Sequence, residues 1–266
     1  MKKFMITGSG RSGTTMMVGL LGAHPEIFCT NELGTFDNES TNLKSRFQLL
    51  RKRIQGVAGG LGFIRNPNKF DPDKFEKETS SMKMPPKTDE LIQALISSCP
   101  IKVNLYGDKF PDYIMNSDEW FADKKNVKIL FMIRDPRDVI GSYISNHGKV
   151  QTYTGQPQWW TSPNFQTVLT KKNWLDYMYS WNRFKTKSGF QYCELYFEDL
   201  LIHPEKTAKK VADFLEVDPM KLVRIFSNPK LVDKSYFQKW RKTVPEINKE
   251  LPEEWIKMME QYGYQV

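Results

Sequence analysis

The chain has 266 residues, and 39 lysines and arginines against 31 aspartates and glutamates give it a formal net charge of +8. Its hydrophobic fraction of 39% and charged fraction of 26% are those of a globular protein, and they exclude a disordered or membrane-embedded chain. The basic residues are spread along the chain, so the charge alone does not indicate nucleic-acid binding.

The cysteines, the histidines and the N-terminal residues argue against a metalloprotein, a disulfide-rich protein and a secreted or membrane-spanning protein. The three cysteines and three histidines are scattered and match neither a metal-ligand spacing nor a disulfide framework. The first ten residues hold too few apolar side chains for a signal peptide, and no run approaches the roughly 18 apolar residues of a membrane helix. We therefore expect a protein without a membrane span, located in the cytoplasm.

Apolar runs that end in turn residues predict five strands, over Lys3–Thr7, Ile27–Thr30, Val103–Gly107, Val127–Ile133 and Tyr192–Phe197. Helical patterns alternate with them, over Gly13–Gly22, Pro136–His147, Asn173–Lys187, Pro204–Leu215 and Pro252–Tyr262. Strands that alternate with helices predict an α/β fold of the P-loop-like, three-layer kind, with a central parallel sheet flanked by helices.

We expect one domain over residues 1–266, with an insertion at about 34–98 and a long loop at about 148–170. The insertion is polar, with helical pieces near Leu43–Ile54 and Asp89–Ser97. The loop contains three aromatic residues that either stack on an acceptor or anchor the loop: Tyr153, Trp159 and Trp160.

Polar and charged clusters follow four of the predicted strands. They are Gly8–Thr15, Asn31-Glu32, Asp108-Lys109 and Arg134-Asp135. Ligands of parallel α/β sheets bind outside the carboxyl ends of the strands, so these clusters should meet at one site.

The first cluster, GSGRSGTT, has the glycine spacing of a phosphate-binding loop, but Thr14 occupies the position of the usual lysine. Its glycines and the following helix N-terminus suit an oxyanion, and Arg11 supplies a positive charge. We expect further contacts from Ser12, Gly13, Thr14 and Thr15. The alternative is an ordinary glycine- and serine-rich turn.

A P-loop kinase or triphosphatase is the natural competing class. It would need a lysine on the β- and γ-phosphates and an acidic ligand for Mg²⁺. The lysine is absent, and Arg134 and Arg137 flank the candidate acid Asp135, where they oppose metal binding.

With these residues identified, the chain resembles the family of sulfotransferases that use 3′-phosphoadenosine 5′-phosphosulfate (PAPS). ITGSGRSGTTMMVGLL, at residues 6–21, is similar to the family's 5′-phosphosulfate loop. KILFMIRDPRDVIGSY, at residues 128–143, is similar to its 3′-phosphate motif. HPEIFCTNE, GDKFPDY and LYFEDLLIHP resemble further family segments, although Phe197 stands where tyrosine is usual.

The resemblance implies that Arg134 and Ser142 bind the 3′-phosphate of the donor. Through a looser similarity it also implies contacts from Tyr196, Ser227 and Lys239, the last within a segment like the loop that closes over the 3′ side.

For the chemistry, we expect a catalytic base at Glu32 and no metal. Arg11 should stabilise the bridging oxygen as the donor bond breaks, and Lys109 should either contact the transferring sulfuryl group or orient the acceptor. The alternative is that Glu32 and Lys109 form only a structural ion pair, which would suit a nucleotide-binding protein without catalysis. The implied reaction transfers a sulfuryl group from PAPS to a hydroxyl or amine and releases adenosine 3′,5′-bisphosphate (PAP). The acceptor class stays open among small molecules, carbohydrates, lipids and peptides.

Overall fold

The computed structural model of the protein describes residues 1–36, 45, 47–48, 70–83, 86–115, 126–145, 174–187 and 189–265. Five strands form one sheet in the order β2-β3-β1-β4-β5, and every neighbouring pair is parallel. The strands are β1 (Lys2–Gly8), β2 (Ile27–Asn31), β3 (Leu105–Lys109), β4 (Val127–Ile133) and β5 (Tyr192–Tyr196).

Both faces of the sheet are buried, which explains why β4 is apolar at every position except Lys128 near its start. Side chains of successive strand residues point to opposite faces. Leu130 and Met132 therefore pack in one hydrophobic cluster, and Ile129, Phe131 and Ile133 pack in the other.

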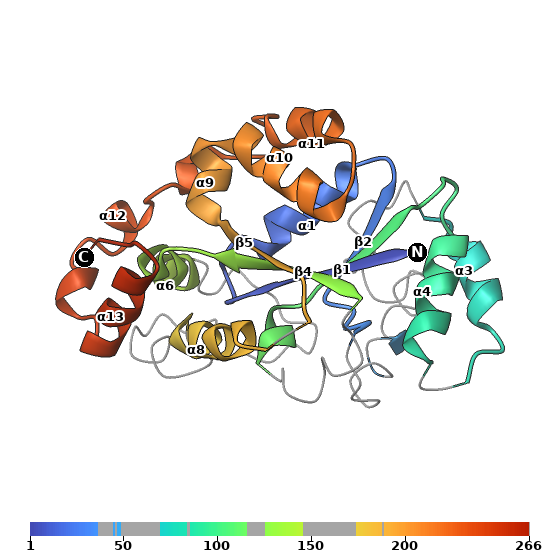
Figure 1. Ribbon diagram of the computed structural model, residues 1–266, viewed down its shortest axis with the longest axis horizontal. Coiled ribbons are helices and arrows are strands. Elements are labelled where there is room, and N and C mark those ends of the chain that lie inside the picture. Colours follow the sequence, from blue (N-terminus) through green and yellow to red (C-terminus); the bar gives the residue numbers. More distant parts are fainter. Residues whose placement is uncertain are drawn as a thin grey trace.

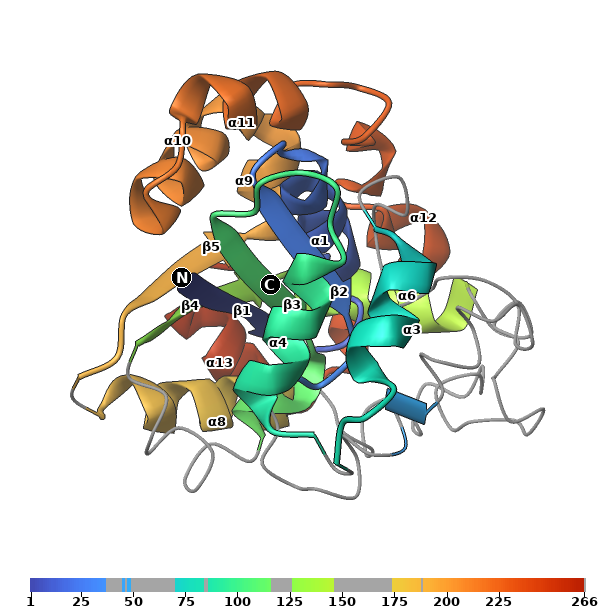
Figure 2. The same ribbon diagram turned by 90° about the vertical axis from the view of Figure 1, so that its right-hand side faces the viewer.

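Within the described part of the chain, four helices cover one face, at the top of Figure 1. They are α1 (Thr14–Ala23), α9 (Phe197–Ile202), α10 (Pro204–Leu215) and α11 (Pro219–Phe226). The opposite cluster includes residues of α3 (Pro72–Thr79), α4 (Thr88–Ser97), η2 (Pro111–Ile114), α8 (Trp174–Lys185) and α13 (Glu253–Gln261). Figure 2 shows α10 and α11 on one side of the sheet and α8 on the other, which confirms the three-layer fold.

Helix α6 (Pro136–Ser145) follows β4 and packs against α12 (Trp240–Thr243). Short 3₁₀ turns η4 (Lys234–Tyr236) and η5 (Ile247–Lys249) flank α12 in the chain. Among the residues that the structure describes, no helix is long and apolar enough to cross a membrane.

The predicted strands are all present, with shifted ends. β3 runs to Lys109 rather than to Gly107, because Asp108 and Lys109 continue the ladders with β1 and β2. β5 ends at Tyr196, because Phe197 already begins α9.

Helices α3, α9 and α11 were not anticipated, whereas α4 matches the helical piece expected near Asp89–Ser97. Most of the piece expected near Leu43–Ile54, and all of the loop at 148–170, lie outside the described residues.

Gly107, in the middle of β3, leaves room for an aromatic ring from the neighbouring strand. A Cβ atom at this position would lie 2.1 Å from the ring of Phe4, which is fully buried. A Cβ atom at Gly19, on the exposed side of α1, would have no atom of the described residues within 4 Å. The two glycines therefore provide a matched pair for testing the packing of the sheet.

Gly107→Ala should lower the free energy of unfolding by about 1–3 kcal/mol, because the added methyl group overpacks the core. Gly19→Ala should raise it by up to about 1 kcal/mol, because alanine favours the helix. Urea unfolding of both variants measures the difference, and equal stability of the two would contradict this packing.

Glu198, near the start of α9, links the ends of β4 and β5. Its carboxylate accepts a hydrogen bond from the backbone N–H of Asp135 at 2.9 Å and one from the hydroxyl of Tyr264 at 3.0 Å. Burial raises the pKa of Glu198 from 4.5 to about 7. The nearby charge of Asp135 also raises this pKa, whereas the hydrogen bonds lower it.

Because the pKa of Glu198 is higher in the folded protein, the unfolded chain ionises first as the pH rises. The free energy of unfolding should therefore fall between about pH 4.5 and pH 7, by roughly 1–3 kcal/mol. Glu198→Gln should remove this decline, and the exposed Glu254→Gln should keep it. Urea unfolding across this pH range is the measurement, and an unchanged profile in Glu198→Gln would refute the assignment.

Candidate active site

Glycines shape the loop that follows β1. Gly8 has a φ of 142°, and a Cβ there would lie 2.4 Å from the carbonyl oxygen of Met132 in β4. Gly13 has a φ of 88°, and a Cβ there would lie 2.2 Å from the ring of Phe197. The loop can therefore lie directly on β4 and α9, and α1 begins at its end with N–H groups suited to an anion.

The three hydroxyls expected in this loop have different surroundings. Ser12 donates both its hydroxyl, at 2.6 Å, and its backbone N–H, at 3.2 Å, to the carbonyl oxygen of Ser9. Its hydroxyl closes the loop, so the expectation that it serves as a ligand donor does not fit this geometry. Thr14 is buried and Thr15 is exposed at the start of α1.

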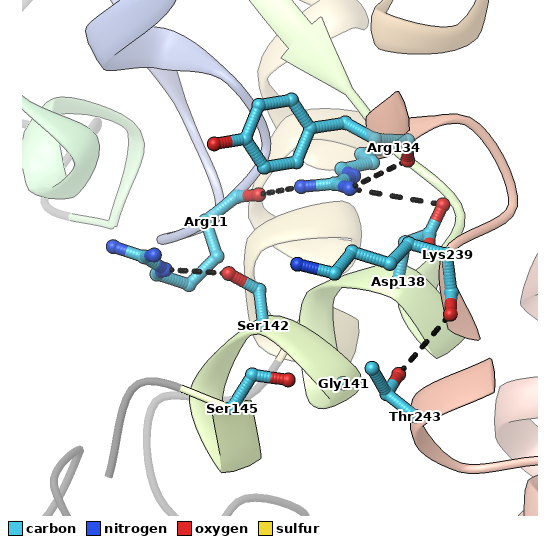
Figure 3. Close-up of a pocket in the computed structure, with 9 residues that line it drawn as sticks. Arg11, Arg134, Asp138, Gly141, Ser142, Ser145, Lys239 and Thr243 are labelled. Carbon is cyan, nitrogen blue, oxygen red and sulfur yellow. Dashed lines mark hydrogen bonds and ion pairs between the residues drawn. The ribbon is translucent and has the colours of Figure 1, made fainter. Parts of the chain in front are cut away.

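A cavity lies beside the loop, between α6 and the segment that contains η4 and α12 (Figure 3). Nε of Arg11 donates a hydrogen bond to the hydroxyl of Ser142 at 2.9 Å. The ammonium of Lys239 points toward the space between Arg134 and Ser142. The cavity thus unites Arg11, Arg134, Ser142 and Lys239, four of the residues expected to bind the donor.

Arg134 is only 5% exposed and joins several parts of this cavity. It donates hydrogen bonds to the carbonyl oxygens of Arg11 at 3.0 Å and Tyr236 at 3.2 Å. Its guanidinium lies 4.3 Å from the ring centroid of Phe197 and 3.7 Å from the carboxylate of Asp138.

Burial lowers the pKa of Arg134, because water no longer stabilises its charge. Its Nε is also buried and has no hydrogen-bond partner among the residues that the structure describes. A buried guanidinium with an unused donor is well suited to bind an anion.

The far wall of the cavity is formed by residues 233–243, which we call the strap. Asp138 of α6 accepts a hydrogen bond from the backbone N–H of Trp240 at 2.7 Å. The guanidinium groups of Arg137 and Arg241 lie 4.3 and 4.7 Å from the centroid of the same indole ring. These contacts fix the strap to α6 and so set where Lys239 stands.

Several residues that line the cavity were not predicted from the sequence. They are Asp138, Gly141, Ser145, Tyr236 and Thr243. Helical spacing could have found two of them, because Asp138 and Ser145 lie four residues before and three residues after Ser142 on α6. The strap residues follow no periodic pattern in sequence that ties them to α6.

Tyr196 and Ser227 do not line this cavity. The ring centroid of Tyr196 lies 6.3 Å from that of Tyr264, and Ser227 ends α11. Their contact with the donor stays a prediction. Phe197, which replaces the tyrosine usual in the resembling family, supports Arg134 with its ring instead of a hydroxyl.

Glu32 and Lys109 meet at the carboxyl ends of β2 and β3. The N–H of Glu32 donates to the carbonyl oxygen of Lys109 at 2.6 Å, and the ammonium of Lys109 pairs with the Glu32 carboxylate. The Lys109 side chain is 3% exposed, whereas that of Glu32 is 47% exposed. The ion pair that was considered as the alternative to catalysis is present, and the Glu32 carboxylate in it remains exposed to solvent.

Arg11 and Glu32 both adopt the left-handed backbone conformation, with φ of 67° and 59°. For residues with a side chain this conformation costs about 1–3 kcal/mol, and it persists only where surrounding contacts enforce it. Such residues concentrate at functional sites, and here they are two of the three predicted catalytic groups.

Two buried tyrosine hydroxyls lie on this side of the sheet, Tyr143 of α6 beside the glycine loop and Tyr177 of α8 beside η2. A Cβ at Gly10 would lie 2.2 Å from the hydroxyl of Tyr143, whose pKa burial raises to about 12. The hydroxyl of Tyr177 in α8 donates to the carboxylate of Asp112 at 2.5 Å. The aromatic residues considered for acceptor stacking lie outside the described residues: Tyr153, Trp159 and Trp160.

Solved structures share this fold. A sulfotransferase domain from the curacin biosynthetic pathway superposes with a TM-score of 0.65 at 19% identity, covering 100% of this chain and 98% of that chain. A mouse sulfotransferase complexed with PAP has a TM-score of 0.54 at 13% identity, covering 97% of this chain and 84% of that chain. At these identities the likeness supports the fold.

Sequence comparison supports the family. Protein-tyrosine sulfotransferase A of Caenorhabditis elegans is 28% identical over 220 residues, which are 80% of this chain and 49% of that protein. The chain spans about half the length of the curated relatives it matches. The sulfotransferase family model matches residues 4–221, and the chain therefore belongs to the sulfotransferase family.

Proposed function

We propose that the protein transfers a sulfuryl group from PAPS to an acceptor hydroxyl and releases PAP. The observation that carries this proposal is the pairing of two adjacent anion sites. One is the glycine loop at the start of α1, and the other is the cavity that contains Arg134, Ser142 and Lys239. PAPS carries anionic groups at both its 5′ and 3′ positions, so it can occupy both sites at once.

Each of the two sites would bind a different part of the donor. Arg134, Ser142 and Lys239 would bind the 3′-phosphate, to which the buried guanidinium offers its unused Nε. Arg11, which borders both sites, would contact the phosphosulfate together with the N–H groups of α1. The mouse sulfotransferase complexed with PAP supports this choice of nucleotide.

The reaction needs a proton acceptor on one side of sulfur and positive charge on the other. Glu32 would take the proton of the acceptor hydroxyl as its oxygen bonds to sulfur. The bond between sulfur and the phosphate oxygen then breaks, and PAP leaves with the electron pair. Arg11 and Lys109 would neutralise the charge that develops on the oxygens.

A phosphate-transferring enzyme is less well supported. Thr14 stands where a kinase or triphosphatase would place its lysine, and the neighbouring cavity offers cations for a second anion site. A nucleotide-binding protein without catalysis would share the donor site and lack the function of Glu32, so substitution of Glu32 separates it from an enzyme.

For the acceptor, a hydroxyl-bearing compound is the proposal. The matching relatives are named protein-tyrosine sulfotransferases, which makes a tyrosine peptide one candidate beside carbohydrates, lipids and small metabolites. A screen of these classes with labelled PAPS would identify the acceptor. Cytoplasmic location stays a prediction from the sequence.

Wild-type protein should be stabilised against heat by PAP more than by ATP with Mg²⁺. Arg134→Ala should weaken PAP binding roughly 10- to 100-fold, the loss expected for a hydrogen bond to a charged group. The exposed Arg224→Ala should bind PAP as the wild type does. Isothermal titration checks the affinities, and stabilisation by ATP with Mg²⁺ alone would exclude the proposed donor.

Glu32→Gln should keep PAP binding and lower turnover of labelled PAPS by about 10²- to 10⁴-fold, the range for loss of a general base. Glu254→Gln, an exposed substitution of the same kind on α13, should leave turnover unchanged. Undiminished turnover in Glu32→Gln would remove Glu32 as the base.

A further inference from the structure

Asp108, the residue before Lys109 in β3, has a carboxylate that the proposed reaction does not use. The residue is fully buried, yet its side chain accepts five hydrogen bonds. The donors are the hydroxyls of Thr30 (2.7 Å) and Tyr113 (2.5 Å) and the backbone N–H groups of Leu33 (3.4 Å), Gly34 (2.8 Å) and Thr35 (3.1 Å).

Three of these donors are consecutive backbone N–H groups, and they belong to the chain directly after Glu32. Successive N–H groups that converge on one point form an anion-binding concavity called a nest. Here the anion is the carboxylate of Asp108 itself. The path of residues 33–35 is therefore set by a side chain from the neighbouring strand.

The backbone of Glu32 is held from both directions by β3. On one side its N–H donates to the carbonyl oxygen of Lys109, and on the other the nest around Asp108 fixes the next three residues. Glu32 adopts the left-handed conformation between these two anchors. Contacts of this kind are what a strained residue requires in order to persist.

We infer that Asp108 is the positioning residue of Glu32: its carboxylate holds the turn that aims the Glu32 side chain at the acceptor. This inference rests on the proposed function of Glu32 as the base. The carboxylate of Glu32 pairs with the ammonium of Lys109, whereas the carboxylate of Asp108 holds the backbone that follows Glu32. Asp108 thus acts through the backbone of the turn.

Asp108→Asn tests the inference with little change of shape, because it replaces one acceptor oxygen by an NH₂ group that cannot accept these bonds. The turn should loosen, and kcat should fall about 10- to 100-fold, as expected when a catalytic group is misplaced. The KM for PAPS and the affinity for PAP should stay within about twofold, because the donor cavity lies beyond β1.

Thr30→Val is the matched control. It removes a buried donor to the same carboxylate and leaves the three N–H groups of the nest in place. It should lower stability and leave kcat within about twofold of the wild type. A fall in kcat as large as that in Asp108→Asn would show that loss of stability alone explains the effect, and it would overturn the inference.

A double-mutant cycle with Glu32→Gln separates positioning from general damage. If Asp108 acts through Glu32, Asp108→Asn should lower the residual rate of Glu32→Gln less than about threefold, because the group it positions is already disabled. If instead the fold losses in kcat of the two single variants multiply in the double variant, the inference is overturned, and Glu32 remains the proposed base. Full activity of Glu32→Gln itself would instead overturn the proposed base and this inference with it.

Gly34→Ala is the substitute test of the inference if Asp108→Asn does not fold. Gly34 has a φ of 73°, so a side chain there strains the nest while the carboxylate stays intact. Its kcat should fall with unchanged PAP affinity, and the loss should again vanish in the Glu32→Gln background. A loss of kcat that persists in that background would count against the inference.

Discussion

The buried charge of Arg134 is the constraint on which the donor side of the molecule depends. The buried charge of a guanidinium must be compensated, and here the carbonyl oxygens of Arg11 and Tyr236, the carboxylate of Asp138 and the ring of Phe197 do so together. Those partners come from the phosphate loop, the strap, α6 and α9. One side chain therefore contacts four segments at once, and its remaining donor, Nε, is the group proposed to bind the nucleotide.

Much of the fold follows from the sequence, because its signals are local. Val127–Ile133 is apolar except for Lys128, as expected for a strand buried on both faces, and the glycine spacing before α1 marks the phosphate loop. The carboxyl ends of parallel strands share one edge, which is why the clusters at Gly8–Thr15 and Arg134 were expected to meet. The structure brings Arg11, Arg134, Ser142 and Lys239 into one cavity as predicted.

The parts of the fold and of the site that the sequence does not predict depend on contacts between distant segments. Nothing local in the sequence indicates that the backbone of Trp240 is held by Asp138, about a hundred residues earlier. Because Asp108 and Lys109 are charged, the sequence predicts that the strand ends before them. They continue the strand instead, because each finds a partner for its charge or its hydrogen bonds on the neighbouring chain segments.

The strand order has a consequence for how such a protein can be altered. The groups proposed to bind the nucleotide follow β1 and β4. Those proposed to act on the acceptor and the transferring group, Glu32 and Lys109, follow β2 and β3, on the other side of β1 from β4. Arg11, at the end of the central strand, borders both. Under the proposed roles, changes toward a new acceptor therefore belong at the β2–β3 end, around a fixed Glu32 and Lys109, while the nucleotide-binding groups are kept. Arg11 is then a position that must suit both the acceptor and the nucleotide.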